Sequence, residues 1–180
     1  MQREERKIFY LKCFMKAFSQ NGIDKTTIKK MARAADMSEA SIYQYFKNKD
    51  EIIIDCVKMY FANLQNEYFP VLKNDKLTLN QKIEKCIKLS KKFKPQGKFT
   101  IQVLTSPSYE KLCAPVLREF QQNLISVCDV ISEQQSLPKD SVYSFLLLFF
   151  SVFYSGGIMG DENAMEVQID FLQNMMEHAC

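Results

Sequence analysis

Apolar residues recur every three or four positions along most of this chain, and that spacing predicts amphipathic helices. Clear stripes of this kind occupy residues 3–20, 49–72, 78–93 and 109–135. The 180 residues include only 5 Gly and 5 Pro, which leaves few positions for the tight turns of β-hairpins. The pattern therefore predicts an all-α fold.

The stripe of the first predicted helix contains Ile8, Leu11, Met15 and Phe18. Asn21-Gly22 is expected to end that helix, because glycine readily takes the positive φ found just past a helix end. A similar break is expected in the middle of the chain at residues 95–97, Pro-Gln-Gly. We therefore expect the helix over 78–93 to stop there and a short apolar helix to follow over 99–104.

Residues 141–160 contain no charged side chain and include the run LLLFF. Twenty uncharged residues are long enough to span a membrane, but several hydroxyl side chains and Gly156-Gly157 argue against that reading. A helix that is apolar on all sides is otherwise buried on all sides. In a chain of this size, we interpret it as part of a subunit interface, together with a last helix over 162–178.

Residues 26–52 show three short helical pieces with two sharp breaks. Thr26 and Thr27 can cap the first piece, since a hydroxyl oxygen accepts a hydrogen bond from a free amide at a helix start. Asp36 tolerates the left-handed conformation that a tight turn between helices needs. Ser38 can then cap the second piece, and Asn48 with Glu51 forms a capping box for the third.

Two helices joined by such a turn form a helix-turn-helix, in which the second helix lies in the major groove of DNA. Ile42 and Phe46, four residues apart, are expected to point inward from the second helix. Spacing alone leaves open the alternative of a small helical domain with two capped helices in succession.

The identities of the residues in this segment distinguish between these alternatives better than their spacing does. The stretch TTIKKMARAADMSEASIYQYF, followed by Lys49, resembles the DNA-binding domain of the TetR family of bacterial transcriptional regulators. The shared features include the two threonines, the pair Met31-Ala32, the pair Ile42-Tyr43 and the aromatic pair Tyr45-Phe46. Upstream, a phenylalanine and a glycine also stand where the family ends its first helix and turns.

Two positions depart from the family pattern. The family usually has glycine where this chain has Asp36, and often has glycine where it has Ala40. Because Ala40 changes the surface that the second helix offers to the groove, the resemblance transfers no base preference.

The resemblance implies a helix-turn-helix DNA-binding domain over residues 1–54 and a helical ligand-binding and dimerisation domain over residues 55–180. It implies a repressor that binds a palindromic double-stranded DNA operator as a homodimer and is released by a small ligand. Hydroxyls, an ammonium and helix starts suit phosphates, whereas Gln and Glu can read base edges. The residues expected at the DNA are Thr27, Ser38, Glu39, Ala40, Ser41, Tyr43, Gln44, Tyr45 and Lys49.

The middle helices hold large apolar and aromatic side chains, and in the TetR family such helices enclose a ligand cavity. No charged residue falls on the inferred inner stripes, so an apolar ligand is expected. The alternative is that these side chains are plain core. The candidate ligand-binding residues are Met59, Tyr60, Leu64, Phe99, Val103, Tyr109, Leu112 and Phe120.

In the same family the last two helices pair with their symmetry mates in a four-helix dimer bundle. The apolar composition of the last two predicted helices fits that role. The candidate interface residues are Phe145, Phe149, Phe153, Met165, Ile169 and Leu172.

Charge is distributed unevenly along the chain. Residues 1–49 hold 11 Lys and Arg against 5 Asp and Glu, whereas residues 50–180 hold 13 against 16. A positive excess on the segment with the helix-turn-helix is what phosphate binding requires, although an ordinary solvated surface could show the same excess.

Candidate catalytic chemistry is sparse. The six cysteines are scattered, which predicts neither a metal site nor a disulfide framework, and the single histidine is His178. Neither a nucleophile elbow nor a phosphate-binding glycine loop is present. We expect a non-enzymatic cytoplasmic protein without a cofactor or metal. The main alternative is a helical small-molecule-binding protein with a vestigial helix-turn-helix, and the other is an enzyme on a helical scaffold.

Overall fold

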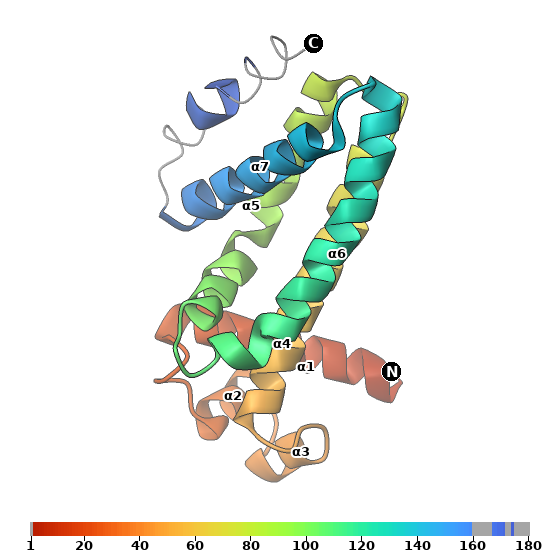
Figure 1. The fold of residues 1–180 in the computed structure, drawn as a ribbon. Helices are drawn as coiled ribbons and strands as arrows, with labels where there is room; N and C mark the ends of the chain where they lie inside the picture. The colour runs from red at the N-terminus through yellow and green to blue at the C-terminus, as the bar shows by residue number, and fades with distance from the viewer. Residues whose placement is uncertain (1, 160–166, 172–173, 175–180) are drawn as a thin grey trace. The chain divides into compact units, whose positions relative to one another are not determined.

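The computed structural model describes residues 2–159, 167–171 and 174, and within these ranges every regular element is a helix. Residues 167–171 are also helical. The all-α prediction is confirmed. The numbered elements, shown in Figure 1, are α1 (Arg3–Asn21), α2 (Ile28–Ala34), α3 (Glu39–Tyr43), α4 (Lys49–Leu72), α5 (Leu79–Leu104), α6 (Glu110–Gln135) and α7 (Lys139–Met159).

The chain divides into two compact units. The first unit comprises Met1–Asn63 and Pro95–Leu117, and the second comprises Leu64–Lys94 and Arg118–Cys180. Helices α4, α5 and α6 each contribute residues to both units. The first unit therefore includes a middle segment that was not assigned to the DNA-binding domain from the sequence, and a functional boundary between residues 54 and 55 stays a prediction.

The predicted helix ends are largely confirmed. Gly22, just past α1, has φ of 82°, and its N–H donates to the carbonyl of Phe18 at 2.8 Å. Thr27 caps α2 by accepting from the Lys30 amide at 3.3 Å. At the start of α4, the Glu51 amide donates to Asn48 Oδ1 at 2.8 Å.

Thr26 does not cap α2, contrary to the prediction. Its side chain is fully buried, and its hydroxyl donates to the carbonyl of Gly22 at 2.7 Å. The same hydroxyl lies 3.4 Å from the carbonyl oxygen of Ala17. Buried carbonyls need hydrogen-bond donors, and the Thr26 hydroxyl serves this purpose. The bond connects the turn to the end of α1.

The predicted break at residues 95–97 is wrong, because α5 continues without interruption from Leu79 to Leu104. A proline inside a helix costs about 3 kcal/mol. That cost is outweighed where the residues on either side are well buried, and here Phe93 before the proline is 5% exposed and Phe99 after it is fully buried. A Cβ at Gly97 would lie 3.5 Å from the Tyr60 hydroxyl, which is an ordinary contact distance, so close packing does not require glycine at this position.

The core of the first unit is built around paired aromatic rings. Phe14 of α1 meets Phe46 edge to face at 5.8 Å, and Phe18 stacks on Phe99 at 5.1 Å between ring centroids. Ile8 was predicted on the apolar stripe of this helix, but it is 41% exposed and lies outside the core.

The second unit is held by an aromatic cluster on α4, α5, α6 and α7. Phe150 contacts Tyr68 at 5.7 Å and Phe120 at 5.9 Å between centroids, and Tyr68 also contacts Phe93 at 6.0 Å. The cluster brings together side chains that lie far apart in the sequence, and therefore fixes α7 against the other helices of this unit.

Helix α7 is not buried on all sides. Phe145, Phe149 and their apolar neighbours on one face are buried, whereas Leu147 and Leu148 are 40% and 47% exposed. Among the described residues, no helix is long and apolar enough to cross a membrane.

Four of the six cysteines are buried, as expected for small apolar side chains: Cys56, Cys86, Cys113 and Cys128. Cys13 is half-buried. Burial raises the pKa of the Cys86 thiol to about 12, so this thiol stays protonated and unreactive near neutral pH.

Candidate nucleic-acid interface

A tight turn joins α2 to α3. Asp36 has φ of 50°, which confirms its predicted left-handed conformation. The N–H of Met37 donates to the carbonyl of Ala32 at 2.9 Å, and Ser38 Oγ accepts from the Ser41 amide at 3.0 Å. The turn and the cap therefore set the direction in which α3 leaves α2.

Helix α3 has only five residues, which is too short to be stable without tertiary contacts. Ile42 is fully buried and Phe46 is 2% exposed, as predicted. Ile42 anchors the helix itself, and Phe46 anchors the chain three residues after its end, which leaves the other faces of α3 to solvent.

The solvent-facing residues of α3 include most of those predicted to read base edges. Glu39, Ala40 and Gln44 are exposed, and Ser41 is half-buried with its hydroxyl 2.7 Å from that of Ser38. Tyr43, predicted at a phosphate, is 56% exposed. The helix thus offers hydroxyl, amide and carboxylate groups to a partner.

The residues predicted at phosphates have different surroundings. Thr27 is exposed at the start of α2, where its backbone amides and hydroxyl suit an anion. Tyr45 is half-buried, and its ring meets that of Tyr10 edge to face at 5.2 Å. Tyr45 is therefore oriented by α1, while Tyr43 extends into solvent.

Lys49 already has an internal partner. Its Nζ donates to the carbonyl of Ile23 at 2.6 Å. Partial burial lowers its pKa below the usual 10.5, although the carboxylates of Asp24 and Asp50 partly oppose that shift. A contact between this ammonium and a phosphate would compete with the bond that links α4 to the turn after α1.

Two basic residues of α1 hold the segment that follows α3, a role that was not predicted for either from the sequence. Arg3 Nη2 donates to the carbonyl of Gln44 at 2.9 Å. Lys7 Nζ pairs with Asp55 at 2.7 Å and lies 5.3 Å from the centroid of the Phe46 ring. Their spacing of four residues, which places both on one face of α1, is the signal that could have identified them.

Comparison with known proteins identifies this region. Residues 15–56 match the sequence model of the bacterial regulatory proteins of the tetR family. A stretch of 64 residues is 38% identical to the HTH-type transcriptional regulator HbdR of Aromatoleum sp. (strain CIB). The helix-turn-helix segment of this chain is a TetR-family domain. The stretch matched to HbdR covers 36% of this chain and 28% of that protein.

The fold of this chain resembles solved structures over nearly its whole length. A tetR-family transcriptional regulator from Streptomyces coelicolor aligns with a TM-score of 0.73 at 14% identity, over 97% of this chain and 80% of the other. FadR from Bacillus subtilis, solved with stearoyl-CoA, aligns with a TM-score of 0.71 at 17% identity, over 92% and 95%. At these identities the likeness concerns the fold alone.

The two departures from the TetR pattern differ in consequence. Asp36 takes the positive φ that the family's glycine would take, so the turn is preserved. Ala40 is exposed on α3, where it alters the surface offered to DNA. The backbone of the helix-turn-helix is therefore typical, while its reading surface is particular to this chain.

The predicted ligand-binding residues do not form one group within either unit. Leu64 and Phe120 belong to the second unit, and the other six belong to the first. Phe99 and Val103 are fully buried, whereas Leu112 is 43% exposed. These residues stay candidates, with Leu112 outside the apolar interior of its unit.

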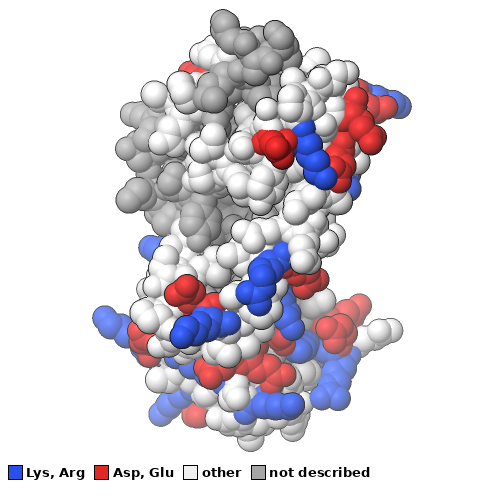
Figure 2. All heavy atoms as spheres, viewed as in Figure 1, with Lys and Arg blue, Asp and Glu red and all other residues white. Residues whose placement is uncertain are grey.

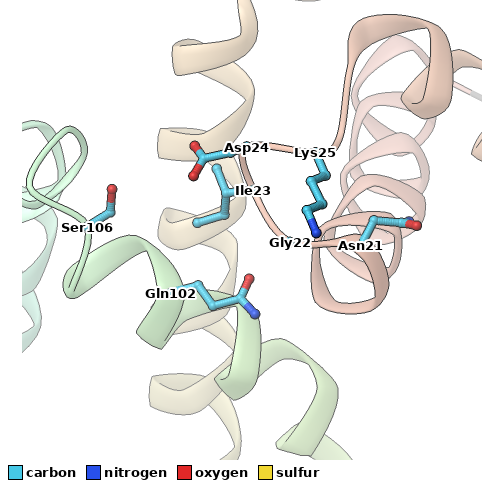
Figure 3. A pocket seen from close by; sticks show the side chains of 7 residues that line it. All are labelled: Asn21, Gly22, Ile23, Asp24, Lys25, Gln102 and Ser106. Atoms are coloured by element: carbon cyan, nitrogen blue, oxygen red, sulfur yellow. The ribbon is translucent and has the colours of Figure 1, made fainter.

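A pocket of about 330 Å³ lies elsewhere in the first unit (Figure 3). Gln102 Oε1 is buried there and has no hydrogen-bond partner among the described residues. The pocket is lined by none of the predicted ligand residues but by Asn21, Gly22, Ile23, Asp24, Lys25, Gln102 and Ser106.

The predicted interface residues also differ in placement. Phe145 and Phe149 are buried inside the second unit, and Ile169 is 5% exposed. Met165, Leu172 and the side chain of Phe153 lie outside the described residues. The exposed apolar residues on the described parts of this region are instead Leu147, Leu148, Val167 and Phe171.

Figure 2 shows one face of the molecule coloured by charge. Over helices α1 to α3, Lys and Arg side chains alternate with Asp and Glu side chains on this face. The positive excess in the sequence is therefore not a continuous basic patch in this view, and the geometry of α3 locates the candidate interface better than charge does.

Proposed function

We propose that this protein is a dimeric transcriptional regulator that places α3 in the major groove of double-stranded DNA. The observation that carries the proposal is the exposed surface of α3, set by a left-handed turn and a serine cap within a TetR-family domain. The similarity to HbdR supports the same function. The proposal accounts for a five-residue helix whose outer side chains are mostly polar and do not pack in the core.

In this proposal Glu39, Ala40, Ser41 and Gln44 face base edges. Gln44 can pair with adenine, and Glu39 can accept a hydrogen bond from cytosine. Thr27, Ser38, Tyr43, Tyr45 and Lys49 lie at the sugar–phosphate backbone, which fixes register without carrying sequence information.

The dimer places two copies of α3 on one operator, so the operator is an inverted repeat. We propose that α7 and the last helix form the interface, with Leu147 and Leu148 on the contact surface. Their exposed area supports this choice, because Phe145 and Phe149 are already buried within the protomer.

We further propose that the protein is a repressor released by an apolar ligand. The fold neighbour FadR was solved with stearoyl-CoA, and the acyl chain of that compound makes hydrocarbon chains the first ligands to test here. Release requires that the ligand bind the DNA-free form more tightly than the DNA-bound form.

The DNA function is tested by recovering genomic fragments on the purified protein, sequencing them and measuring anisotropy on a labelled 30-bp duplex. The selected duplex should bind more tightly than a scrambled duplex, with an affinity that falls steeply with salt. Equal binding to both duplexes would reject sequence-specific regulation. Loss of all duplex binding, with retained binding of apolar compounds, would favour the small-molecule carrier.

Two variants separate the proposed roles on α3. Gln44→Ala should lower the discrimination at one base pair by about 1–3 kcal/mol. Tyr43→Phe keeps the ring and removes only the hydroxyl, so it should weaken binding to every sequence by a similar factor. A change of base preference with Tyr43→Phe would show that the phosphate assignment is wrong.

Lys49 needs its own control because it also binds the Ile23 carbonyl. Lys49→Ala should weaken binding to all duplexes and reduce the salt slope by about one. Lys58, which is exposed on the same helix, provides the matched removal of one charge. A slope that falls equally in both variants would reject a specific contact from Lys49.

The ligand proposal is tested by thermal shift with fatty acids, acyl-CoA thioesters and lipophilic cations. A compound that stabilises the DNA-free protein should also lower its affinity for the selected duplex. Binding without a change in duplex affinity would reject release by that compound, and absence of any binder would leave the named side chains as core.

A further inference from the structure

The end of α3 is held in place from outside the helix. After Tyr43 the chain turns, and the Gln44 and Tyr45 amides donate to carbonyls of α3 at 3.3 and 2.9 Å. The Gln44 carbonyl points away from this ladder and accepts instead from Arg3 Nη2 at 2.9 Å. The guanidinium carbon of Arg3 lies 5.8 Å from the centroid of the Tyr45 ring. One side chain of α1 therefore contacts two consecutive residues of the candidate DNA surface.

Arginine suits this position for three physical reasons. Carbonyls at a helix C-terminus carry partial negative charge and attract cations. A guanidinium can donate a hydrogen bond and lie against an aromatic ring at the same time, which a lysine ammonium does less well. A helix as short as α3 has too few internal hydrogen bonds to hold its own end.

The first turn of α1 is itself fixed. The Gln2 backbone amide donates to Glu5 Oε2 at 2.9 Å, which caps the helix just before Arg3. One turn later, Lys7 lies at 5.3 Å from the Phe46 ring and pairs with Asp55. Arg3 and Lys7 thus hold residues 44–46 from one face of α1, and Arg3 contacts the two that are candidates for DNA contact.

We propose that Arg3 is a positioning residue for DNA recognition, which orients Gln44 and Tyr45 without itself contacting the duplex. The proposal rests on the DNA-binding function proposed above. It assigns a role in recognition to the start of α1, which lies 41 residues from Gln44 in the sequence.

The test compares Arg3→Ala, Arg3→Lys and Arg6→Ala on the selected 30-bp duplex. Arg6 is exposed one turn away on α1, so Arg6→Ala removes the same charge. Arg3→Ala should weaken binding about tenfold more than Arg6→Ala, the size expected from losing one hydrogen bond to a charged group. The dependence of its affinity on salt concentration should equal that of Arg6→Ala. The affinity of Arg3→Lys should lie between those of wild type and Arg3→Ala.

Amide hydrogen exchange on the DNA-free protein provides a second readout. Arg3→Ala should speed exchange at the amides of residues 44–46 several-fold, as local opening becomes easier. The Met31 amide, bonded to the Thr27 carbonyl at 3.0 Å within the first turn of α2, should exchange at the wild-type rate. Faster exchange at Met31 as well would indicate general destabilisation and overturn the positioning role.

Two other outcomes would overturn the proposal, and a third would reject the DNA-binding function on which it rests. Affinity and exchange indistinguishable from Arg6→Ala would overturn the proposal. A salt slope lower by about one than that of Arg6→Ala, with unchanged exchange, would identify a direct phosphate contact and also overturn it. If wild-type protein binds no selected duplex, the proposed function fails. Exchange at residues 44–46 then still decides whether Arg3 holds this segment.

Discussion

Helices α3 and α7 are positioned by different kinds of contact. Helix α3 has five residues, one buried anchor within it and a second, Phe46, just after its end, and directed bonds from a serine cap, a left-handed turn and Arg3. Helix α7 has 21 residues and is held by apolar burial and by ring contacts to other helices, such as Phe150 with Tyr68 of α4. Directed bonds require particular residue types at particular positions, whereas apolar burial accepts many side chains of similar volume. The sequence is therefore more informative about α3 than about α7.

The largest effect should come from the apolar core of the first unit. Phe99 is fully buried and stacks on Phe18, so Phe99→Ala should lower the free energy of unfolding by about 3–5 kcal/mol. Leu112→Ala, at a residue that is 43% exposed, should change it by about 0.5 kcal/mol or less. Urea denaturation followed by circular dichroism measures both.

The same pair of variants tests the two readings of Phe99. A loss below about 1 kcal/mol, together with weaker binding of an apolar ligand, would show that Phe99 lines a cavity. The predicted loss would show that burial, and not a ligand, explains this aromatic residue. The first unit would then contain both kinds of contact, directed bonds at α3 and apolar burial at Phe99.

The features that could be predicted from the sequence are those set by directed bonds, and the features that were missed are those set by apolar burial. The left-handed Asp36, the Ser38 cap and the inward Ile42 and Phe46 were all predicted, because each depends on one residue type at one place. The continuity of α5 was not predicted, since local proline and glycine preferences lose to burial around them. The exposed face of α7 was also missed, because a uniformly apolar stretch has no periodicity to show which side faces the core.

The second largest effect should be on association through α7. Leu148 is 47% exposed, and burial of one such side chain in each protomer of a dimer stabilises it by roughly 3 kcal/mol in total. Leu148→Glu should therefore raise the dimer dissociation constant by about a hundredfold or more. Sedimentation equilibrium at several protein concentrations measures this change.

Phe149→Glu provides the contrasting variant for that experiment. Because Phe149 is buried within its own unit, its substitution should unfold the protomer instead of separating folded protomers. Circular dichroism of Leu148→Glu should remain that of the wild type. If wild-type protein is monomeric at micromolar concentration, the interface proposed for α7 is incorrect.

A smaller effect should come from the ion pair of the first unit. Lys7→Met leaves the Asp55 carboxylate without its ammonium partner, and should lower the free energy of unfolding by about 2 kcal/mol at pH 7. Adding Asp55→Leu should restore part of that loss, because the unpaired carboxylate is then removed. Urea titrations of the two variants and the wild type measure the coupling.

The pH dependence of the Lys7 contribution has a definite sign. The hydrogen bond to Asp55 raises the pKa of Lys7 above 10.5 in the folded protein, so the charged form is favoured by folding. The stabilisation is therefore complete below pH 10.5 and is lost as the pH rises through the folded pKa. The difference between wild type and Lys7→Met should stay constant from pH 7 to about pH 9.5 and shrink above about pH 10.5. A difference that grew above that pH would exclude a stabilising charge on Lys7.

The smallest effect should come from two backbone positions, one in each unit. Asp36 has φ of 50° and Ser136 has φ of 53°, and these are the non-glycine residues with positive φ in the described part of the chain. A non-glycine residue in this conformation costs roughly 1 kcal/mol, whereas glycine adopts it without strain. Glycine also gives the unfolded chain more freedom, which offsets part of the gain.

Asp36→Gly and Ser136→Gly should each raise the free energy of unfolding by about 0.5 kcal/mol, and thermal melts should detect the shift. Neither variant should alter duplex affinity, because glycine keeps the positive φ of the turn that directs α3, and Ser136 lies after α6. Equal changes in affinity for both variants would show that general stability, and not the turn, governs DNA binding.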